Sequence, residues 1–359
     1  MLYELSEKIY KLENEGKRVI RLDIGEPDWR PPESAFRTLL DSLEDGRDRY
    51  ASAAGELELR EKIAELHGCD ARNVVITPGS KWGIFMLLKL HLKSRDNAII
   101  FSPHWPAYEL ICKSLKANPR ILKLKSEDNW RINFASLEDA IDSKTKIIIL
   151  NSPCNPTSHA WGEREERNIM ELASERGIPL LVDDAYRDLC FRRRKERQLG
   201  DNLLIANTFS KTFGMTGWRI GYIAVPAEIA HKAVKLNQIT INNVSVFLQM
   251  AASKAIEEKM KFAEKVRKIC KRRAEIAAGI LVRRMHFTHP NAGLYLFPKL
   301  PERIDTGRFL RRLLENGIAV APGNAFGEYK QHIRISLCKR EEILKKALDK
   351  IVEVVEECE

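Results

Sequence analysis

The sequence predicts an α/β fold, with a large doubly wound domain built on a mostly parallel sheet and a smaller α+β domain. Two observations lead to this prediction. Short apolar runs alternate with helical patterns through the first two thirds of the chain, and the last quarter mixes strand-like pieces with helices. With 359 residues and 44% hydrophobic content, the chain can bury one large core and a second, smaller one.

Five short apolar runs, each bounded by polar or turn residues, predict buried parallel strands. They cover residues 74–77, 98–101, 146–150, 179–183 and 203–207. Four helical patterns separate or follow these strands, as a doubly wound domain requires. They cover residues 81–91, 107–116, 163–176 and 228–237.

Residues 245–284 form a long amphipathic pattern without proline, which predicts more than one helix leading out of the first domain. Beyond it, AGLYLF and HIRISL indicate strands, while 306–315 and 340–357 indicate helices. We therefore expect a segment 1–30 that joins the small domain, a large domain 31–260 and a small C-terminal domain 261–359.

The net charge of +10 raises the question of nucleic acid binding. The basic residues, however, are spread along helices that are also rich in glutamate, as in EEKMKFAEKVRKICKRRAE. The one compact basic run, Arg192-Arg193-Arg194-Lys195, lacks interleaved aromatic residues and is interpreted as a solvated surface loop. We expect no nucleic acid partner.

Membrane and metal chemistry also receive no support. The sequence has no run of 18 or more apolar residues, and its start, MLYELSEKIYKLENEGK, is a charged helical pattern rather than a signal peptide. The seven cysteines are scattered and without CxxC spacing, which indicates reduced thiols and no zinc site. These features predict a cytoplasmic protein without a bound metal.

The segment NTFSKTFGMTGWRIGY, residues 207–222, carries the clearest chemical signal. Lys211 comes just after two hydroxyl residues, Thr208 and Ser210, and is followed by Arg219. A lysine that forms a Schiff base with a cofactor aldehyde needs rigid surroundings, and anion-binding groups nearby can hold a phosphate. Because pyridoxal 5'-phosphate carries both groups, the segment indicates a site for it. A solvated Lys and Arg on a loop is the alternative for the segment taken alone.

This segment closely resembles the lysine segment of the class I/II aminotransferases, the aspartate-aminotransferase-like branch of fold-type I pyridoxal phosphate enzymes. Matches to the family recur in its order between Gly25 and Arg334. The resemblance implies Lys211 as the residue that holds the cofactor and moves protons. It also implies a phosphate site made of Ser80, Lys81, Thr208, Ser210, Arg219 and, reaching across the interface of a homodimer with shared active sites, Tyr50.

The same resemblance assigns the residues around the cofactor ring. Trp105, in SPHWPAY, matches the aromatic residue that stacks on the ring. Asp183 matches the carboxylate that pairs with the ring nitrogen and keeps the ring cationic. Asn155 and Tyr186 match the two residues hydrogen-bonded to the phenolic oxygen. Lys211, Asp183 and Tyr186 are thus the implied catalytic residues.

For the substrate, the resemblance implies that Arg334, in HIRISL, binds the α-carboxylate together with Asn155, and that Gly25 lies at the pocket floor. Ser158 departs from the family, which has a glycine there. No arginine occurs at 241–243, where dicarboxylate-specific members of one subgroup carry one. We therefore expect neutral or aromatic amino donors to be used at least as well as aspartate.

The implied activity is transfer of an amino group from an amino acid to a 2-oxo acid through a lysine Schiff base. The same residues could also serve a carbon–sulfur β-lyase, a decarboxylase or a cyclase, since all share the carbanion intermediate. Histidinol-phosphate aminotransferase is a nearer alternative, because those chains are similarly short. From another class, a non-catalytic basic scaffold would use the net charge of +10.

Overall fold

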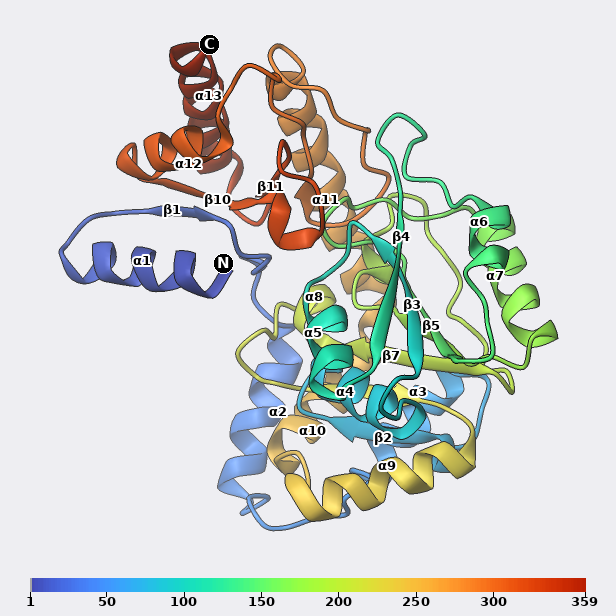
Figure 1. The fold of residues 1–359 in the computed structure, drawn as a ribbon. Helices are drawn as coiled ribbons and strands as arrows, with labels where there is room; N and C mark the ends of the chain where they lie inside the picture. Colours follow the sequence, from blue (N-terminus) through green and yellow to red (C-terminus); the bar gives the residue numbers. More distant parts are fainter. Residues whose placement is uncertain (1) are drawn as a thin grey trace.

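The computed structural model describes residues 2–359, which form two lobes joined by the long helix α11 (Lys259–Leu281) (Figure 1). The larger lobe holds a seven-stranded sheet with the order β2-β8-β7-β6-β5-β3-β4. Six of these strands point the same way, and β8 runs antiparallel to both of its neighbours. The strands are β2 (Val74–Thr77), β3 (Asn97–Ser102), β4 (Asn118–Lys123), β5 (Thr145–Asn151), β6 (Leu180–Asp183), β7 (Leu203–Thr208) and β8 (Gly221–Ala224).

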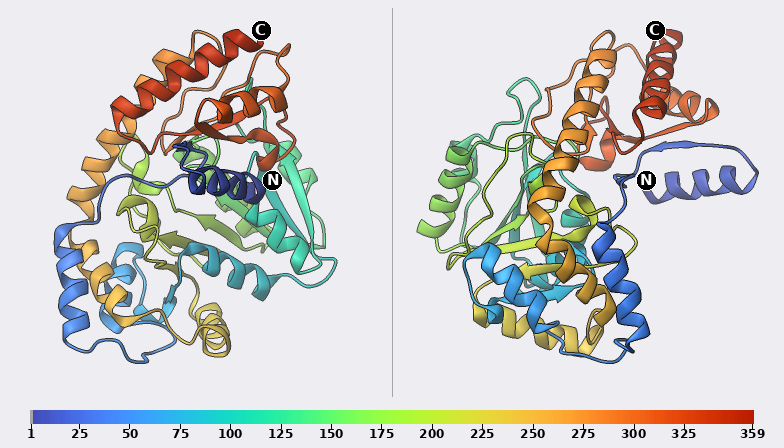
Figure 2. Two further views of the ribbon diagram at one scale, coloured as in Figure 1. Left: turned by 90° about the vertical axis from the view of Figure 1, so that its left-hand side faces the viewer. Right: turned by 180° about the vertical axis from the view of Figure 1, so that it is seen from behind.

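Helices cover both faces of this sheet, which is why its inner strands contain continuous apolar runs. In β5, Ile147 and Ile149 pack into one core and Ile148 and Leu150 into the other, because successive side chains point to opposite faces. Helices α4, α5 and α9 supply the first core, and α3, α7 and α10 supply the second. Figure 2 shows these layers from two further sides.

The helices of the larger lobe are α2 (Glu33–Glu44), α3 (Leu57–His67), α4 (Ser80–His91), α5 (Ala107–Ser114), α6 (Phe134–Asp139), α7 (Glu163–Glu175), α8 (Phe209–Thr212), α9 (Ala227–Thr240) and α10 (Val246–Glu257). Short 3-10 turns occur at Ala71–Asn73, Arg187–Leu189 and Gly323–Phe326.

The smaller lobe contains a four-stranded sheet with the order β1-β10-β11-β9. Strand β1 (Ile20–Leu22) pairs in parallel with β10 (Ile318–Pro322), so the N-terminal segment lies in this lobe (Figure 1). Strands β11 (Ile333–Ser336) and β9 (Tyr295–Leu296) continue the sheet in antiparallel fashion. The helices are α1 (Leu2–Asn14), α12 (Thr306–Glu315) and α13 (Glu341–Cys358), and the last two pack with α11 around a separate core.

Two strands of the large sheet were missing from the prediction. Strand β4 lies at the sheet edge and is only half-buried, so it lacks a continuous apolar run. Strand β8 is fully buried but has only four residues and starts with Gly221, which gives a weak strand pattern.

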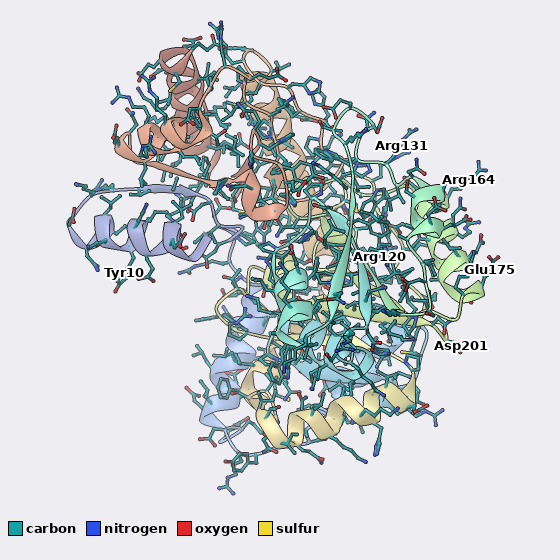
Figure 3. The ribbon with its side chains drawn as sticks, in the orientation of Figure 1. Tyr10, Arg120, Arg131, Arg164, Glu175 and Asp201 are labelled. Atoms are coloured by element: carbon teal, nitrogen blue, oxygen red, sulfur yellow. The ribbon has the colours of Figure 1, made fainter. Side chains whose placement is uncertain are left out.

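Figure 3 shows Arg120, Arg131, Arg164 and Glu175 on the larger lobe, where basic and acidic side chains occur together. The prediction of a solvated loop at residues 192–195 is wrong for Arg194. Its guanidinium donates to Glu166 at 2.7 Å, and its side chain is 12% exposed. A buried carboxylate requires such a partner, so this arginine has a structural role.

Among residues 2–359, no group of His, Cys, Asp and Glu side chains is arranged to hold a metal ion. Within the same range, no helix has the length and apolar character needed to cross a membrane.

Candidate active site

A cavity of about 330 Å³ lies at the carboxyl ends of the parallel strands and receives residues from both lobes. Open parallel sheets bind ligands at this edge. Every predicted site residue except Tyr50 lines the cavity. They are Gly25, Ser80, Lys81, Trp105, Asn155, Asp183, Tyr186, Thr208, Ser210, Lys211, Arg219 and Arg334.

One end of the cavity is built to hold an anion. Helix α4 begins at Ser80 and directs its free backbone N–H groups to this end. The hydroxyls of Thr208 and Ser210 lie 2.9 Å apart at the start of α8. Arg219 adds a guanidinium, and its backbone has a φ of 54°, a strained conformation for a non-glycine residue that often marks a functional site.

Two glycines allow these segments to approach each other. Gly79 has a φ of 80°, and a Cβ there would lie 2.8 Å from a guanidinium nitrogen of Arg219. A Cβ on Gly221 would lie 2.7 Å from the backbone nitrogen of Ser80. The turn, the arginine and strand β8 can therefore meet at the anion end only without these side chains.

Lys211 lies on the short helix α8, which Thr208 caps by accepting from the backbone N–H of Ser210. Its Nζ donates to the carbonyl oxygen of Gly25 at 2.7 Å. The amino group is therefore held at the floor of the cavity, between the two lobes.

Asp183 ends strand β6 and is 4% exposed. It accepts hydrogen bonds from the Tyr108 hydroxyl at 2.6 Å and from the backbone N–H of Ala185 at 3.1 Å. Burial raises the pKa of this carboxyl to about 6, and the two hydrogen bonds limit the rise. A cation beside Asp183 would remove this cost.

Asn155 and Tyr186 lie together on the next side of the cavity, with the amide nitrogen of Asn155 3.4 Å from the Tyr186 hydroxyl. Asn151, at the end of β5, fixes both loops. Its side chain accepts from the backbone N–H of Asn155 at 2.8 Å and donates to the carbonyl of Asp183 at 2.9 Å. Burial raises the pKa of the Tyr186 phenol well above its usual value, so this hydroxyl keeps its proton.

Arg334 enters from β11 in the small lobe. Its guanidinium packs against the rings of Tyr295 and Phe326, 4.4 and 4.7 Å from their centroids. One Nη donates to Asn155 Oδ1 at 2.8 Å, and the other donates to the carbonyl of Asp23. The buried Nε has no partner among residues 2–359, so the guanidinium still offers a donor to a carboxylate.

Trp105 and Tyr50 differ in where the structure places them. Trp105 is half-buried in the cavity wall, with Lys81 Nζ 5.1 Å from its ring centroid. Tyr50 is 89% exposed and lies outside the cavity of its own chain.

Two tyrosines with contacts in the cavity were missed by the sequence reasoning. Tyr108 lies three residues after Trp105, within the run SPHWPAY, and donates to Asp183. Tyr295 lies within the predicted strand AGLYLF, and its hydroxyl is 3.0 Å from that of Tyr186. A buried tyrosine in an apolar run is usually a core residue, so nothing local to either run marks a site.

Two α/β lobes with a lysine, a buried aspartate and an anion site between them define a pyridoxal-phosphate enzyme of fold type I. A family model described as aminotransferase class I and II matches residues 17–351, and the chain belongs to this family.

Known relatives span nearly the full chain. An aspartate aminotransferase of Thermococcus kodakarensis is 33% identical over 94% of this chain and 88% of its own length. A (5-formylfuran-3-yl)methyl phosphate transaminase of Methanocaldococcus jannaschii is 34% identical over 96% of this chain and 93% of its own. Among solved structures, aspartate aminotransferase from Thermotoga maritima has a TM-score of 0.91 and 28% identity, covering 99% of this chain and 96% of that one.

Pyridoxal phosphate, the cofactor of this family, fits the groups in the cavity. At the anion end, burial and the neighbouring cations Arg219 and Lys211 lower the pKa of Lys81, and a phosphate would relieve their repulsion. At the other end, the buried carboxylate of Asp183 suits a protonated ring nitrogen. The chain is thus a pyridoxal-phosphate-dependent aminotransferase acting on amino acids and 2-oxo acids.

Proposed function

We propose that this chain catalyses amino acid:2-oxo acid transamination in amino acid metabolism, with Lys211 as its proton carrier. The observation that carries the proposal is the convergence on one cavity of Lys211, Asp183 and Arg334, which come from three distant parts of the chain. Bound pyridoxal phosphate supplies an electron-withdrawing ring that accepts the electrons left when the α-proton departs.

Lys211 performs the proton transfers in this proposal. Its Nζ takes the proton from the α carbon of the amino acid and later returns one. The hydrogen bond to Gly25 O, 2.7 Å long, supports this role because it holds the free amine at the cavity floor. A positioned amine that is withdrawn from bulk water can act as a general base.

Asp183 and Tyr186 set the electronic properties of the ring. Asp183 keeps the ring nitrogen protonated, because burial of an unpaired carboxylate is costly and a cation removes that cost. Tyr186 donates to the phenolic oxygen together with Asn155. Trp105 packs against the ring face. Ser80, Lys81, Thr208, Ser210 and Arg219 hold the phosphate.

Arg334 and Asn155 bind the α-carboxylate. The guanidinium packs against the rings of Tyr295 and Phe326, and its Nε is free to donate. Asn155 Oδ1 holds one Nη at 2.8 Å, which sets the plane of the fork. Gly25 forms the adjacent floor.

The enzyme uses neutral or aromatic amino acids as donors at least as well as it uses aspartate. The chain has no arginine at 241–243. Solved structures similar to this chain include aromatic as well as aspartate aminotransferases. An aromatic aminotransferase from Pyrococcus horikoshii has 29% identity and a TM-score of 0.88, covering 98% of this chain and 99% of that one.

The protein acts as a homodimer with shared active sites. Tyr50 is 89% exposed and unavailable to its own cavity, which suits a role in the neighbouring subunit. An apolar groove containing Phe85 and Leu110 borders the cavity and shares Lys81 and Arg219 with it, so the anion end is open to an approaching subunit. The seven cysteines are free thiols, which supports a cytoplasmic location.

The proposal is tested by mixing purified holoenzyme with single amino acids while recording its visible spectrum and the products. Loss of the visible band together with one 2-oxo acid per site is the expected result, and an added 2-oxo acid should restore the band. Release of carbon dioxide or of a thiol without conversion of the cofactor would show a decarboxylase or β-lyase instead.

A further inference from the structure

Tyr295, on β9 of the small lobe, contacts several groups of the active site at once. Its side chain is buried, and its hydroxyl lies 3.0 Å from the Tyr186 hydroxyl. Its ring supports the Arg334 guanidinium at 4.4 Å. A Cβ on Gly25 would lie 1.8 Å from the Tyr295 oxygen, so the glycine is what allows this phenol to reach the cavity floor.

The surroundings of the two phenols determine which one donates. The Tyr295 hydroxyl makes no hydrogen bond within residues 2–359 except that to Tyr186, and a buried hydroxyl proton without an acceptor is costly. Tyr186 faces the cavity, where its own proton has a use. The arrangement that satisfies both therefore has Tyr295 donating to the Tyr186 oxygen while Tyr186 donates into the cavity.

Ser158 fixes the backbone that carries Tyr295. Its Oγ accepts from the backbone N–H of Tyr295 at 2.9 Å, across the boundary between the lobes. Ser158 has a φ of 53°, and a Cβ on Gly293 would lie 2.3 Å from its Oγ. The serine at this usual glycine position thus has a strained backbone, which its hydrogen bond to β9 helps to offset.

We propose that Tyr295 is a positioning residue: by donating to the Tyr186 oxygen, its hydroxyl turns the Tyr186 proton toward the phenolic oxygen of the bound cofactor. The inference rests on the proposed role of Tyr186. Arg334 and Asp183 act electrostatically on Tyr186, and Lys211 lines the same cavity; all three remain when only the Tyr295 hydroxyl is removed.

The test is a pH titration of the visible spectrum of the holoenzyme, without substrate. A hydrogen bond donated to the phenolic oxygen favours its anionic form, so loss of that bond raises the titration midpoint. We expect Tyr186→Phe to raise the midpoint, and Tyr295→Phe to raise it by a smaller amount, about 0.5 pH unit or more. In the Tyr186→Phe background, Tyr295→Phe should add nothing, because its target is gone.

A matched control is Tyr329→Phe, which removes another buried phenol that donates across the lobes, to the carbonyls of Ser102 and Leu124, but lies outside the cavity lining. Its midpoint should equal that of the unmodified enzyme.

The outcomes separate the two proposals. An unchanged midpoint in Tyr186→Phe refutes the role of Tyr186 itself. If Tyr186→Phe raises the midpoint but Tyr295→Phe does not, the role of Tyr295 is overturned. It is also overturned if Tyr295→Phe shifts the midpoint equally in the unmodified enzyme and in the Tyr186→Phe variant. If Tyr295→Phe does not fold, Ser158→Gly is the second variant: it suits the positive φ and releases β9. A rise in its midpoint supports the proposal, and an unchanged midpoint contradicts it.

Discussion

Asp183 illustrates how a single residue links stability to function. Its carboxyl is buried among apolar and hydroxyl groups, and burial raises its pKa from the usual 3.8 to about 6. Without the cofactor, the protein therefore contains an unfavourable charge near neutral pH. With the cofactor, the proposed ring cation pairs with that charge, so the same residue contributes binding energy and chemistry.

Asp183→Asn should stabilise the cofactor-free protein at neutral pH. The folded carboxyl binds its proton more tightly than the unfolded one, so this group lowers stability progressively as pH rises from about 4 to about 6. The neutral amide avoids that loss, and its single oxygen can accept either from the Tyr108 hydroxyl or from the backbone N–H of Ala185, where the carboxylate accepts from both. We expect a gain of about 1–3 kcal/mol at pH 8, shrinking toward pH 5, in urea unfolding of the two apoproteins.

The same variant should be severely impaired as an enzyme, because the amide cannot keep the ring nitrogen protonated. We expect turnover of the holoenzyme to fall on the order of a thousandfold. Equal apoprotein stabilities at pH 8, or near-normal turnover, would contradict this account of Asp183.

Arg334 is the residue whose removal should affect all substrates alike. Every α-amino acid presents the same carboxylate. Arg334→Ala should therefore lower kcat/KM for each donor, by a factor that corresponds to a loss of roughly 2–5 kcal/mol of transition-state stabilisation. The control is Arg120→Ala, which breaks an ion pair with Asp142 outside the cavity lining and should leave kcat/KM unchanged. A decrease in kcat/KM confined to one class of donors would show that Arg334 binds the substrate side chain instead of the α-carboxylate.

At the scale of elements, the turn between β2 and α4 builds the anion end. Gly79 precedes the helix with a φ of 80°, and the Arg219 guanidinium packs over it. The glycine thus serves two purposes: it permits the left-handed backbone, and it leaves room for the arginine beside the helix N-terminus.

Gly79→Ala should weaken cofactor binding about tenfold or more, because the added methyl group displaces Arg219. Gly16→Ala is a matched control, since Gly16 also has a φ of 80° but open space around it. Both variants should lose some stability from backbone strain, and only Gly79→Ala should lose cofactor affinity in an equilibrium titration. Equal affinities in the two variants would show that Arg219 does not depend on this turn.

The strands that carry the site were predictable because both of their faces are buried. Strands β5 and β6 form continuous apolar runs, and the polar residues that follow each run mark the edge where ligands bind. The half-exposed edge strand β4 lacks that signal. Short reversed strands such as β8 depend on their neighbours more than on their own sequence.

At the scale of the whole molecule, the cavity exists because two lobes meet. Arg334 and Tyr295 come from the small lobe, and Asn155 and Tyr186 come from the large one. Matched motifs identified most of the lining residues, including Arg334. They could not identify Tyr295 or Tyr108, because the roles of those tyrosines depend on contacts between distant segments that no local pattern records.

The exposed position of Tyr50 leads to a prediction about assembly. Sedimentation of the holoenzyme should show a dimer, and Tyr50→Ala should weaken cofactor binding about tenfold, through loss of a phosphate contact. Tyr10→Ala, which removes another exposed tyrosine, on α1, should leave binding unchanged. A monomer that holds its cofactor and turns over normally would rule out the shared site.

In the proposed function, Lys211 holds the cofactor at the junction of the lobes. Reduction of the holoenzyme with borohydride, followed by digestion and peptide sequencing, tests it most directly. We expect one labelled peptide, from the segment 207–222, with the cofactor attached to Lys211. Attachment to any other lysine, or label spread over several lysines, would contradict the claim.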